Sequence, residues 1–217
     1  MRFRILASPS QDALSYLLGD RGEAVVIDPV PGIDALVRAL LTEYRLKLVL
    51  VLHTHLHHGR TSCARELATA CNVRIGAGAR AAAIENSLPL AEGETVRFGR
   101  ERLHVLDTPG HTPGCVSYLW RDRLFCGDAL DVAGCAAGDS EADIGTLHDS
   151  LMRKIFSLPD ETLLFPAHPV KGRYVSLVIE ERTRHARRGG LSRDQLLSDM
   201  VLHRHRPGSS AARNGSA

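Results

Sequence analysis

Apolar and polar positions alternate along the first half of the chain in a pattern that predicts strands separated by helices. Short apolar runs are typical of strands, whereas apolar positions three and four residues apart are typical of helices. The run at 46–52 is almost continuously apolar, which predicts a strand covered on both faces. The expected strands are 3–6, 14–18, 24–28 and 46–52, with a hairpin turn at 19–22, and the expected helices are 33–44 and 61–71.

The second half repeats this alternation more loosely. Strands are expected at 95–98, 103–107, 116–119, 124–126 and 163–165, and helices at 147–157, 175–187 and 193–201. Residues 203–217 are rich in Ser, Gly, Ala and Arg, a composition that predicts a disordered tail. Two strand–helix halves of similar style predict an α/β fold, an αββα sandwich of two facing sheets with helices outside. We expect one domain over residues 1–202.

Composition and charge exclude several classes of function. The chain has 217 residues, a net charge of +2 and 44% hydrophobic residues, as is ordinary for a globular protein. So small a charge gives no reason to expect binding to nucleic acid or membranes, and no apolar run is long enough to span a bilayer. The five cysteines are an odd number and do not have the spacing of a disulfide framework, which favours a reducing compartment. With no secretory leader in the first residues, we predict a cytoplasmic location.

The side chains that could bind a metal lie where strands are expected to end. Four histidines stand in the segment HTHLHH directly after the apolar run 46–52, and three further metal-binding side chains follow separate apolar stretches. Histidines can cluster by chance, but four segments that each deliver a ligand after a strand favour a metalloenzyme. Residues two apart on an extended chain share a face, so alternate histidines of HTHLHH are expected to point the same way. The candidate ligands are His53, His55, His57, His58, His111, Asp128 and His168.

The mixture of imidazoles with one carboxylate narrows the choice of metal. Neutral imidazole suits zinc, iron, copper and nickel, and a carboxylate beside it favours zinc or non-haem iron. None of the candidate ligands is a cysteine, which argues against a closed structural zinc site. The residues alone leave iron and zinc open.

Four motifs in this order, HTHLHH, TPGHTPG, GDA and PAH, resemble the metallo-β-lactamase superfamily. The resemblance covers residues 1–190 and implies the αββα sandwich of the metallo-β-lactamase type. The first motif of the superfamily is normally HxHxDH; read from His53, it places His57 where an Asp is expected. In hydrolases of the superfamily that Asp ligates a second metal, so a neutral His57 favours one metal over two.

Within the superfamily, further stretches resemble the persulfide dioxygenases, the group related to the ethylmalonic encephalopathy protein. They are DALDVAGC at 128–135, LPD at 158–160, KGR at 171–173 and EER at 180–182. This resemblance implies a mononuclear iron dioxygenase, which uses O₂ to oxidise a low-molecular-weight persulfide such as glutathione persulfide to sulfite and thiol. It implies one Fe(II) per chain, held by His53, His111 and Asp128.

The resemblance also implies roles for the other histidines of the motifs. His55, His58 and His168 are expected to be catalytic groups around the iron, where they orient its ligands or a bound water. Candidates for additional metal ligands are His55, His57, His58 and His168.

The chain departs from the group at two places that concern the substrate. The Arg that follows Gly-Cys in the group is absent from residues 135–139, and an Asp and a Tyr are absent between His168 and Lys171. These losses should alter substrate recognition more than iron binding. The identity of the thiol that carries the persulfide sulfur therefore stays open. Lys171 and Arg173 remain candidates for binding an anionic group of the substrate.

Two other functions stay open. A thioester hydrolase similar to glyoxalase II would use two zinc or iron ions, and zinc, one or two ions per chain, is the alternative cofactor. A degenerate family member would bind metal or a thiol without turnover. The expected partners are small molecules, a thiol persulfide with O₂ or a thioester, and a homodimer is one open oligomeric state.

Overall fold

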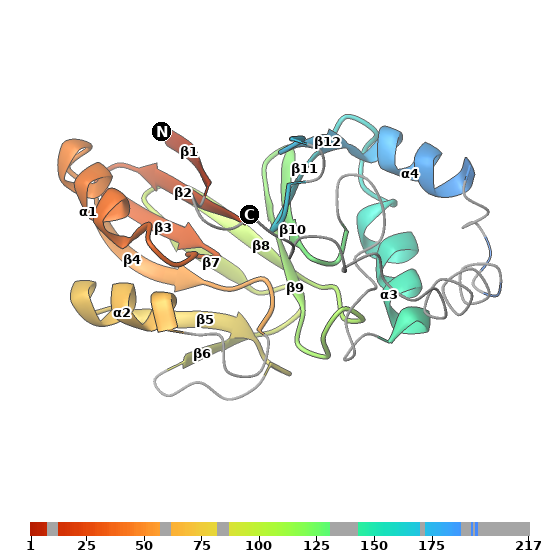
Figure 1. Cartoon of the computed structure of the whole chain (residues 1–217), viewed down its shortest axis with the longest axis horizontal. Coiled ribbons are helices and arrows are strands. Elements are labelled where there is room, and N and C mark those ends of the chain that lie inside the picture. The colour runs from red at the N-terminus through yellow and green to blue at the C-terminus, as the bar shows by residue number, and fades with distance from the viewer. Residues whose placement is uncertain are drawn as a thin grey trace, which may run out of the picture.

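Two six-stranded sheets packed face to face form the protein, with helices on both outer sides (Figure 1). The computed structural model describes residues 1–7, 13–56, 62–81, 87–130, 143–169, 172–187, 192 and 194. The first sheet has the strand order β1-β2-β3-β4-β5-β6. Its strands are β1 (Arg2–Ala7), β2 (Leu14–Asp20), β3 (Glu23–Ile27), β4 (Lys47–Leu52), β5 (Arg74–Gly78) and β6 (Ser87–Leu90).

The second sheet is built from the second half of the chain, in the order β12-β11-β10-β9-β8-β7. Its strands are β7 (Thr95–Phe98), β8 (Glu101–Asp107), β9 (Val116–Trp120), β10 (Arg123–Gly127), β11 (Leu163–Pro166) and β12 (Ser176–Leu177). The helices are α1 (Asp34–Glu43), α2 (Ser62–Cys71), α3 (Ile144–Ser150), which continues as a π-helical segment (Leu151–Ile155), and α4 (Val178–Arg187). No described helix is long and apolar enough to cross a membrane.

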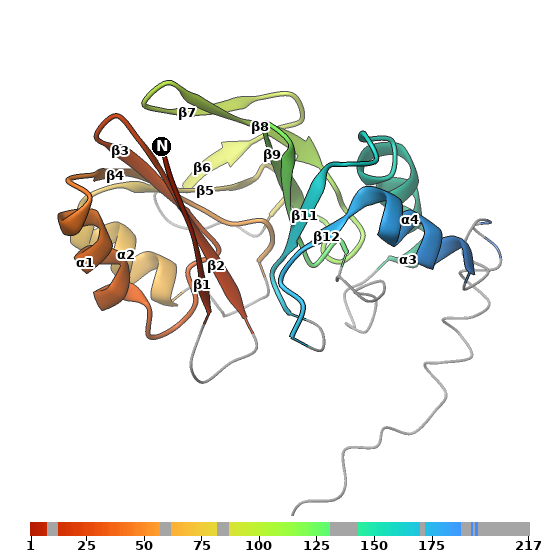
Figure 2. The same ribbon diagram turned by 90° about the horizontal axis from the view of Figure 1, so that it is seen from above.

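Three apolar layers hold these elements together: one between the two sheets, one between the first sheet and helices α1 and α2, and one between the second sheet and helices α3 and α4. Leu50 and Leu52 of β4 pack between the two sheets, whereas Leu48 and Val51 of the same strand pack in the layer under α1 and α2. This strand is therefore buried on both faces, as its continuous apolar run predicts. Figures 1 and 2 show α1 and α2 outside the first sheet, and α3 and α4 outside the second. The predicted αββα sandwich is confirmed.

The direction of neighbouring strands decides where their ends meet. β3 and β4 run parallel with Ile27 opposite Leu52, and β10 and β11 run parallel with Gly127 opposite Pro166. Because parallel strands end at the same edge of a sheet, the residues that follow them lie side by side. Asp28 is thereby brought next to His53, and Asp128 next to the segment that carries His168.

Most of the expected elements are present, and the differences have local causes. The hairpin turn between β2 and β3 is a two-residue turn at Arg21 and Gly22, both with positive φ, as its sequence predicts. Strands β5, β6 and β12 were not expected. Helix α3 begins earlier than 147 because Asp143 caps it by accepting a hydrogen bond from the Thr146 backbone N–H.

The expectations for the end of the chain stay predictions. The expected helix at 193–201, apart from residue 194, and the expected tail at 203–217 lie outside the described residues, and so does the boundary of the domain.

Candidate metal centre

Four loops that leave the two sheets at one edge are joined in two pairs by backbone hydrogen bonds. The Val116 N–H, after the His111 loop, donates to the Thr54 carbonyl at 2.8 Å, and the Ala167 N–H donates to the Gly127 carbonyl at 3.2 Å. The Asp143 N–H ties the same His111 loop to α3 by donating to the Gly110 carbonyl at 2.7 Å. Within each pair, the backbone therefore fixes the relative positions of the two segments that carry the candidate ligands.

The glycine of the TPGH segment is required by the packing of that loop. Gly110 has a φ of +131°, and a Cβ there would lie 2.3 Å from the Cα of Leu147 in α3. Ser150 of the same helix donates its hydroxyl to the Pro109 carbonyl at 2.6 Å. The loop is thus pressed against α3, and His111, only 4% exposed, is held rigidly beside it.

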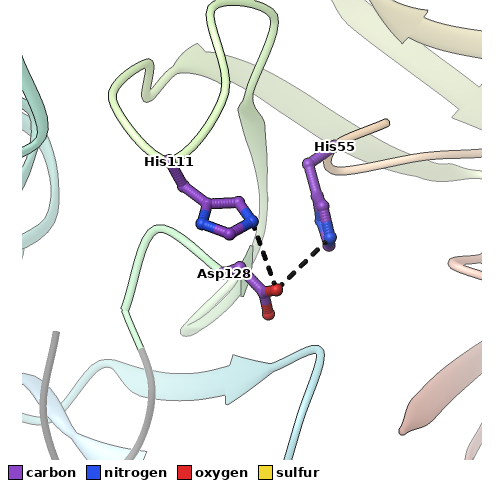
Figure 3. A group of neighbouring side chains, drawn as sticks. All are labelled: His55, His111 and Asp128. Atoms are coloured by element: carbon purple, nitrogen blue, oxygen red, sulfur yellow. Dashed lines mark ion pairs between the residues drawn. The ribbon is translucent and has the colours of Figure 1, made fainter. Parts of the chain in front are cut away.

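Two imidazoles and one carboxylate converge at this edge (Figure 3). The ligand atoms of His55, His111 and Asp128 all lie within 4.8 Å of one another. The Nε2 atoms of His55 and His111 each lie 3.4 Å from Asp128 Oδ2. Two atoms bonded to one ion at about 2.1 Å in tetrahedral or octahedral geometry are themselves about 3.0–3.4 Å apart. The spacing and the donor types of these three residues therefore fit a divalent metal ion.

His53, which was expected to be a ligand, does not join this group. Its Nδ1 lies 3.5 Å from Asp28 Oδ1, and its carbonyl accepts a hydrogen bond from the Tyr118 hydroxyl at 2.7 Å. Its N–H still donates to Gly76 at 2.8 Å, in continuation of β4. The chain bends at Thr54, which breaks the strand alternation that would have placed His53 and His55 on one face. His55, expected as a catalytic neighbour, takes the position assigned to His53.

This difference moves the register of the first motif by two residues. If HxHxDH begins at His55, which belongs to the converging group, it covers residues 55–60, which read HLHHGR. Gly59 then stands where the Asp is expected, and Arg60 where the last His is expected. His57 becomes the second His of the pair rather than the replacement of the Asp. His57 and His58 themselves lie outside the described residues.

His168 lies at the rim of the centre. Its Nε2 is 3.6 Å from the same Asp128 Oδ2 that faces the other two histidines, and its side chain is 51% exposed. It does not belong to the group of ligand atoms within 4.8 Å of one another, as far as the described residues go. The structure thus gives His168 contact with both the carboxylate and solvent.

The substrate-binding candidates receive less support. Lys171 lies outside the described residues. The Arg173 guanidinium donates from Nη2 to Ser176 Oγ and to Glu180 Oε2, both at 3.2 Å, and lies 3.9 Å from the buried Glu181. These contacts join β12 to α4, and they favour a structural role for Arg173.

Two polar residues behind the ligands were missed by the sequence interpretation. Asp28 follows β3 and accepts hydrogen bonds from the Thr54 N–H at 2.8 Å and the Thr54 hydroxyl at 2.7 Å. Burial raises the pKa of Asp28, but the hydrogen bond from His53, the electrostatic contributions of the His55 and His53 rings and the hydrogen bond from Thr54 outweigh it, so its pKa is lowered. An Asp at the end of a strand parallel to the one before HTHLHH was the signal that could have identified it.

Cys115, close to the site, is a neutral thiol. Burial raises its pKa to about 11, against hydrogen bonds from Thr112 that lower it. The Thr112 N–H donates to Cys115 Sγ at 3.2 Å. Because the thiolate is the reactive form of cysteine, this residue serves packing of the His111 loop rather than chemistry.

Residues 11–168 match the metallo-beta-lactamase superfamily, and the chain belongs to it. It is 39% identical over 188 residues to mouse persulfide dioxygenase ETHE1, mitochondrial, covering 83% of this chain and 73% of the relative. The crystal structure of ETHE1 from Myxococcus xanthus superposes with a TM-score of 0.85 at 35% identity, covering 93% of this chain and 90% of the other. The hydroxyacylglutathione hydrolase of Hahella chejuensis is 39% identical over 153 residues, covering 69% of this chain and 58% of the relative. The relatives indicate an enzyme of the oxidoreductase type.

Proposed function

We propose that the protein is a mononuclear iron dioxygenase, which oxidises a low-molecular-weight thiol persulfide to sulfite and the free thiol. The observation that carries the proposal is the convergence of His55, His111 and Asp128 in a chain similar to persulfide dioxygenases along most of its length. Two histidines and one carboxylate with open positions are the ligand set of many non-haem Fe(II) oxygenases.

The residues of the centre would each have a defined task. His55 Nε2, His111 Nε2 and Asp128 would hold the metal, and bound Fe(II) would supply the electron exchange that lets O₂ react with sulfur. Two neutral imidazoles and one carboxylate leave a divalent ion with a net positive charge, which attracts an anionic persulfide. The buried positions of His111 and Asp128 keep these ligands fixed when the substrate binds.

The overall reaction sets a task for His168. A persulfide RSSH with O₂ and water gives RSH, sulfite and two protons; the two sulfur atoms of the persulfide together lose four electrons, and O₂ gains them. His168 Nε2 faces the Asp128 carboxylate, and half of its side chain is exposed. We therefore assign His168 the transfer of protons between the centre and solvent.

The register of the first motif supports one metal ion rather than two. With the motif beginning at His55, the positions that would bind a second ion hold Gly59 and Arg60, neither of which can replace an Asp or a His as ligand. Elemental analysis is expected to give one ion per chain. The double variant Gly59→Asp/Arg60→His restores both ligands, and we expect it to bind a second ion. Two ions in the unaltered protein would contradict the mononuclear centre.

One observation favours thioester hydrolysis as a second candidate. His168 lies 3.6 Å from Asp128 Oδ2, a position from which it could help to hold a second metal next to a bridging carboxylate. Hydroxyacylglutathione hydrolases are also among the relatives. A dinuclear centre would still need the two ligands that residues 59 and 60 do not provide.

The decisive experiment compares the two reactions on the same protein. The chain, loaded anaerobically with Fe(II), is mixed with glutathione persulfide or cysteine persulfide, and O₂ consumption and sulfite are measured together. We expect one O₂ consumed per sulfite formed, and no turnover of a glutathione thioester. Asp128→Ala should abolish the activity, while His104→Gln, which alters an exposed histidine of β8, should keep it. Thioester cleavage without O₂ consumption would overturn the proposal in favour of the hydrolase.

A cytoplasmic location is proposed as well. It rests on the cysteine usage of the sequence and on the free thiols of Cys63, Cys71 and Cys115. Because the mouse relative is named as mitochondrial, fractionation of the cells that make this protein is the test, and recovery from an organelle would contradict the assignment.

A further inference from the structure

Thr54 lies between Asp28 and the metal ligand His55. Its hydroxyl oxygen is 2.7 Å from Asp28 Oδ2 and 3.0 Å from His55 Nδ1. Its backbone N–H donates to the other oxygen of the same carboxylate, Asp28 Oδ1, at 2.8 Å. Thr54 is 1% exposed, so water does not compete for these hydrogen bonds.

The number of protons in this chain of contacts fixes the direction of each hydrogen bond. An ionised carboxylate only accepts, and a hydroxyl has one proton to donate. Thr54 gives that proton to Asp28, so its oxygen can interact with His55 only by accepting a proton from Nδ1. His55 is then the Nδ1–H tautomer, and the lone pair of Nε2 points toward Asp128 and His111.

We propose that Thr54 is a positioning residue. By donating its proton to Asp28 and accepting one from His55 Nδ1, its hydroxyl fixes the tautomer of His55 and thereby sets the affinity of the centre for its metal. The proposal rests on the metal centre described under the proposed function but not on the reaction catalysed there. Hydrogen-bonded partners behind metal-binding histidines fix the tautomer and raise the basicity of the ligand.

Thr54 also contacts the backbone beside the other two ligands. A Cβ on Gly127, the residue before Asp128, would lie 2.3 Å from Thr54 Oγ1. The Thr54 carbonyl accepts the hydrogen bond from Val116 that closes the His111 loop. The side chain of Thr54 thus lies against the segments of His55 and Asp128, and its backbone carbonyl holds the His111 loop, so loss of the hydroxyl is expected to act on the metal rather than on a single histidine.

A pair of substitutions separates the hydroxyl from the shape of the side chain. Thr54→Val keeps the volume and removes the hydroxyl, whereas Thr54→Ser keeps the hydroxyl and removes a methyl group. The affinity for Co(II), measured without substrate against a competing chelator, is expected to fall about 10–100-fold in the Val variant. The Ser variant should retain most of the affinity. A residue that matters only for packing would show the opposite order.

Asp28→Asn tests the direction of the hydrogen bonds. Asp28 Oδ1 faces the Thr54 N–H and His53 Nδ1, so the amide oxygen of Asn is expected to stay on that side. The NH₂ group would then donate to Thr54 Oγ1, and the Thr54 proton would turn toward His55 Nδ1. His55 would become the Nε2–H tautomer, which offers no lone pair to the metal. Asn tolerates the left-handed backbone at this position, where φ is +49°.

The readouts are the Co(II) affinity and the tautomer of His55, observed by ¹⁵N NMR of the imidazole in the metal-free protein. We expect Nδ1–H in the unaltered chain and in Thr54→Ser, and Nε2–H in Asp28→Asn. In a Thr54→Val background, Asp28→Asn should have little further effect on affinity, because the relay is already interrupted.

Several results would overturn the role of Thr54. They are an unchanged Co(II) affinity in folded Thr54→Val, a folded Asp28→Asn that keeps Nδ1–H, or an Nε2–H tautomer in the unaltered protein. If a variant does not fold, the tautomer of the unaltered protein still decides. An unaltered chain that binds no metal would instead refute the centre itself, and one that binds metal without oxidising persulfide would refute only the proposed reaction.

Discussion

Replacing Gly127 by Ala should destabilise the protein through two separable effects at the metal centre. The first is backbone strain, because Gly127 has a φ of +55° and an L-residue in the left-handed region costs about 1–2 kcal/mol. The second is a collision, because the new Cβ would lie 2.3 Å from Thr54 Oγ1 and 2.6 Å from Thr54 Cβ. These atoms are side-chain atoms next to the buried backbone and cannot move far without releasing Asp28.

The size of the second effect follows from the hydrogen bond that is lost. If Thr54 withdraws, its hydroxyl leaves Asp28 Oδ2, a buried charged acceptor, and such a loss costs about 1–3 kcal/mol. Together the two effects amount to about 2–5 kcal/mol in the free energy of unfolding. Urea unfolding of the metal-free protein, followed by fluorescence of the single tryptophan, is the assay.

The hairpin residue Gly22 offers the matched control. It has a φ of +83°, and a Cβ there would meet nothing within 4 Å, so Gly22→Ala carries the strain without the collision. We expect Gly127→Ala to be more destabilising than Gly22→Ala by about 1–3 kcal/mol. Equal effects of the two substitutions would refute the claim that Thr54 is tightly packed between Gly127 and Asp28.

Three further predictions concern groups that are not candidate ligands. The hydrogen bond from Arg121 is the main reason that the pKa of Glu101 is lowered, so Glu101 stabilises the folded state above the pKa of unfolded glutamate and loses this effect as the pH falls through its own pKa. Glu101→Gln should therefore be less stable than the unaltered protein at pH 7 and equally stable in strong acid. A difference in the free energy of unfolding that stays constant with pH would contradict this. Cys115, with a pKa of about 11, should resist iodoacetamide at pH 7.5 in the native protein and react after unfolding, which peptide mapping by mass spectrometry checks; rapid native labelling would be inconsistent with its burial. Arg173→Ala should lower the stability and leave KM unchanged, whereas a raised KM would return Arg173 to the substrate site.

The fold could be predicted where the information lies within each segment. The run at 46–52 is apolar at positions that face both layers, so its burial could be recognised without knowing its neighbours. Strand β5 escaped prediction because its glycines have no side chain to give a pattern; a Cβ on Gly76 would lie 2.8 Å from Leu52 of β4. Strand β6 contains Pro89, which is tolerated because this strand is at the edge of the sheet. The identity of both strands depends on contacts with the rest of the fold.

The candidate site could be predicted to the level of its segments but not of every residue. His111 and Asp128 each stand alone in their motifs, so no choice of register was needed. HTHLHH offers histidines at alternate positions, and only the three-dimensional structure shows that β4 continues through His53 by its bond to Gly76 and turns at Thr54. A shift of the motif by two residues, one period of the strand alternation, replaces His53 by His55. Local pattern cannot distinguish these possibilities, because both obey the same period.

A first motif that begins at His55 changes the electrostatics expected of the centre. Two divalent ions about 3.5 Å apart repel each other by about 19 kcal/mol at an effective dielectric constant of about 20. At the same effective dielectric constant, a carboxylate bound at about 2.1 Å attracts a second ion by about 16 kcal/mol. Asp128 alone therefore does not offset the repulsion, and a further carboxylate would. Because residue 59 is Gly and residue 60 is a cationic Arg, the charge balance favours a single ion with a free coordination face, which is the arrangement that a dioxygenase needs and a dinuclear hydrolase does not.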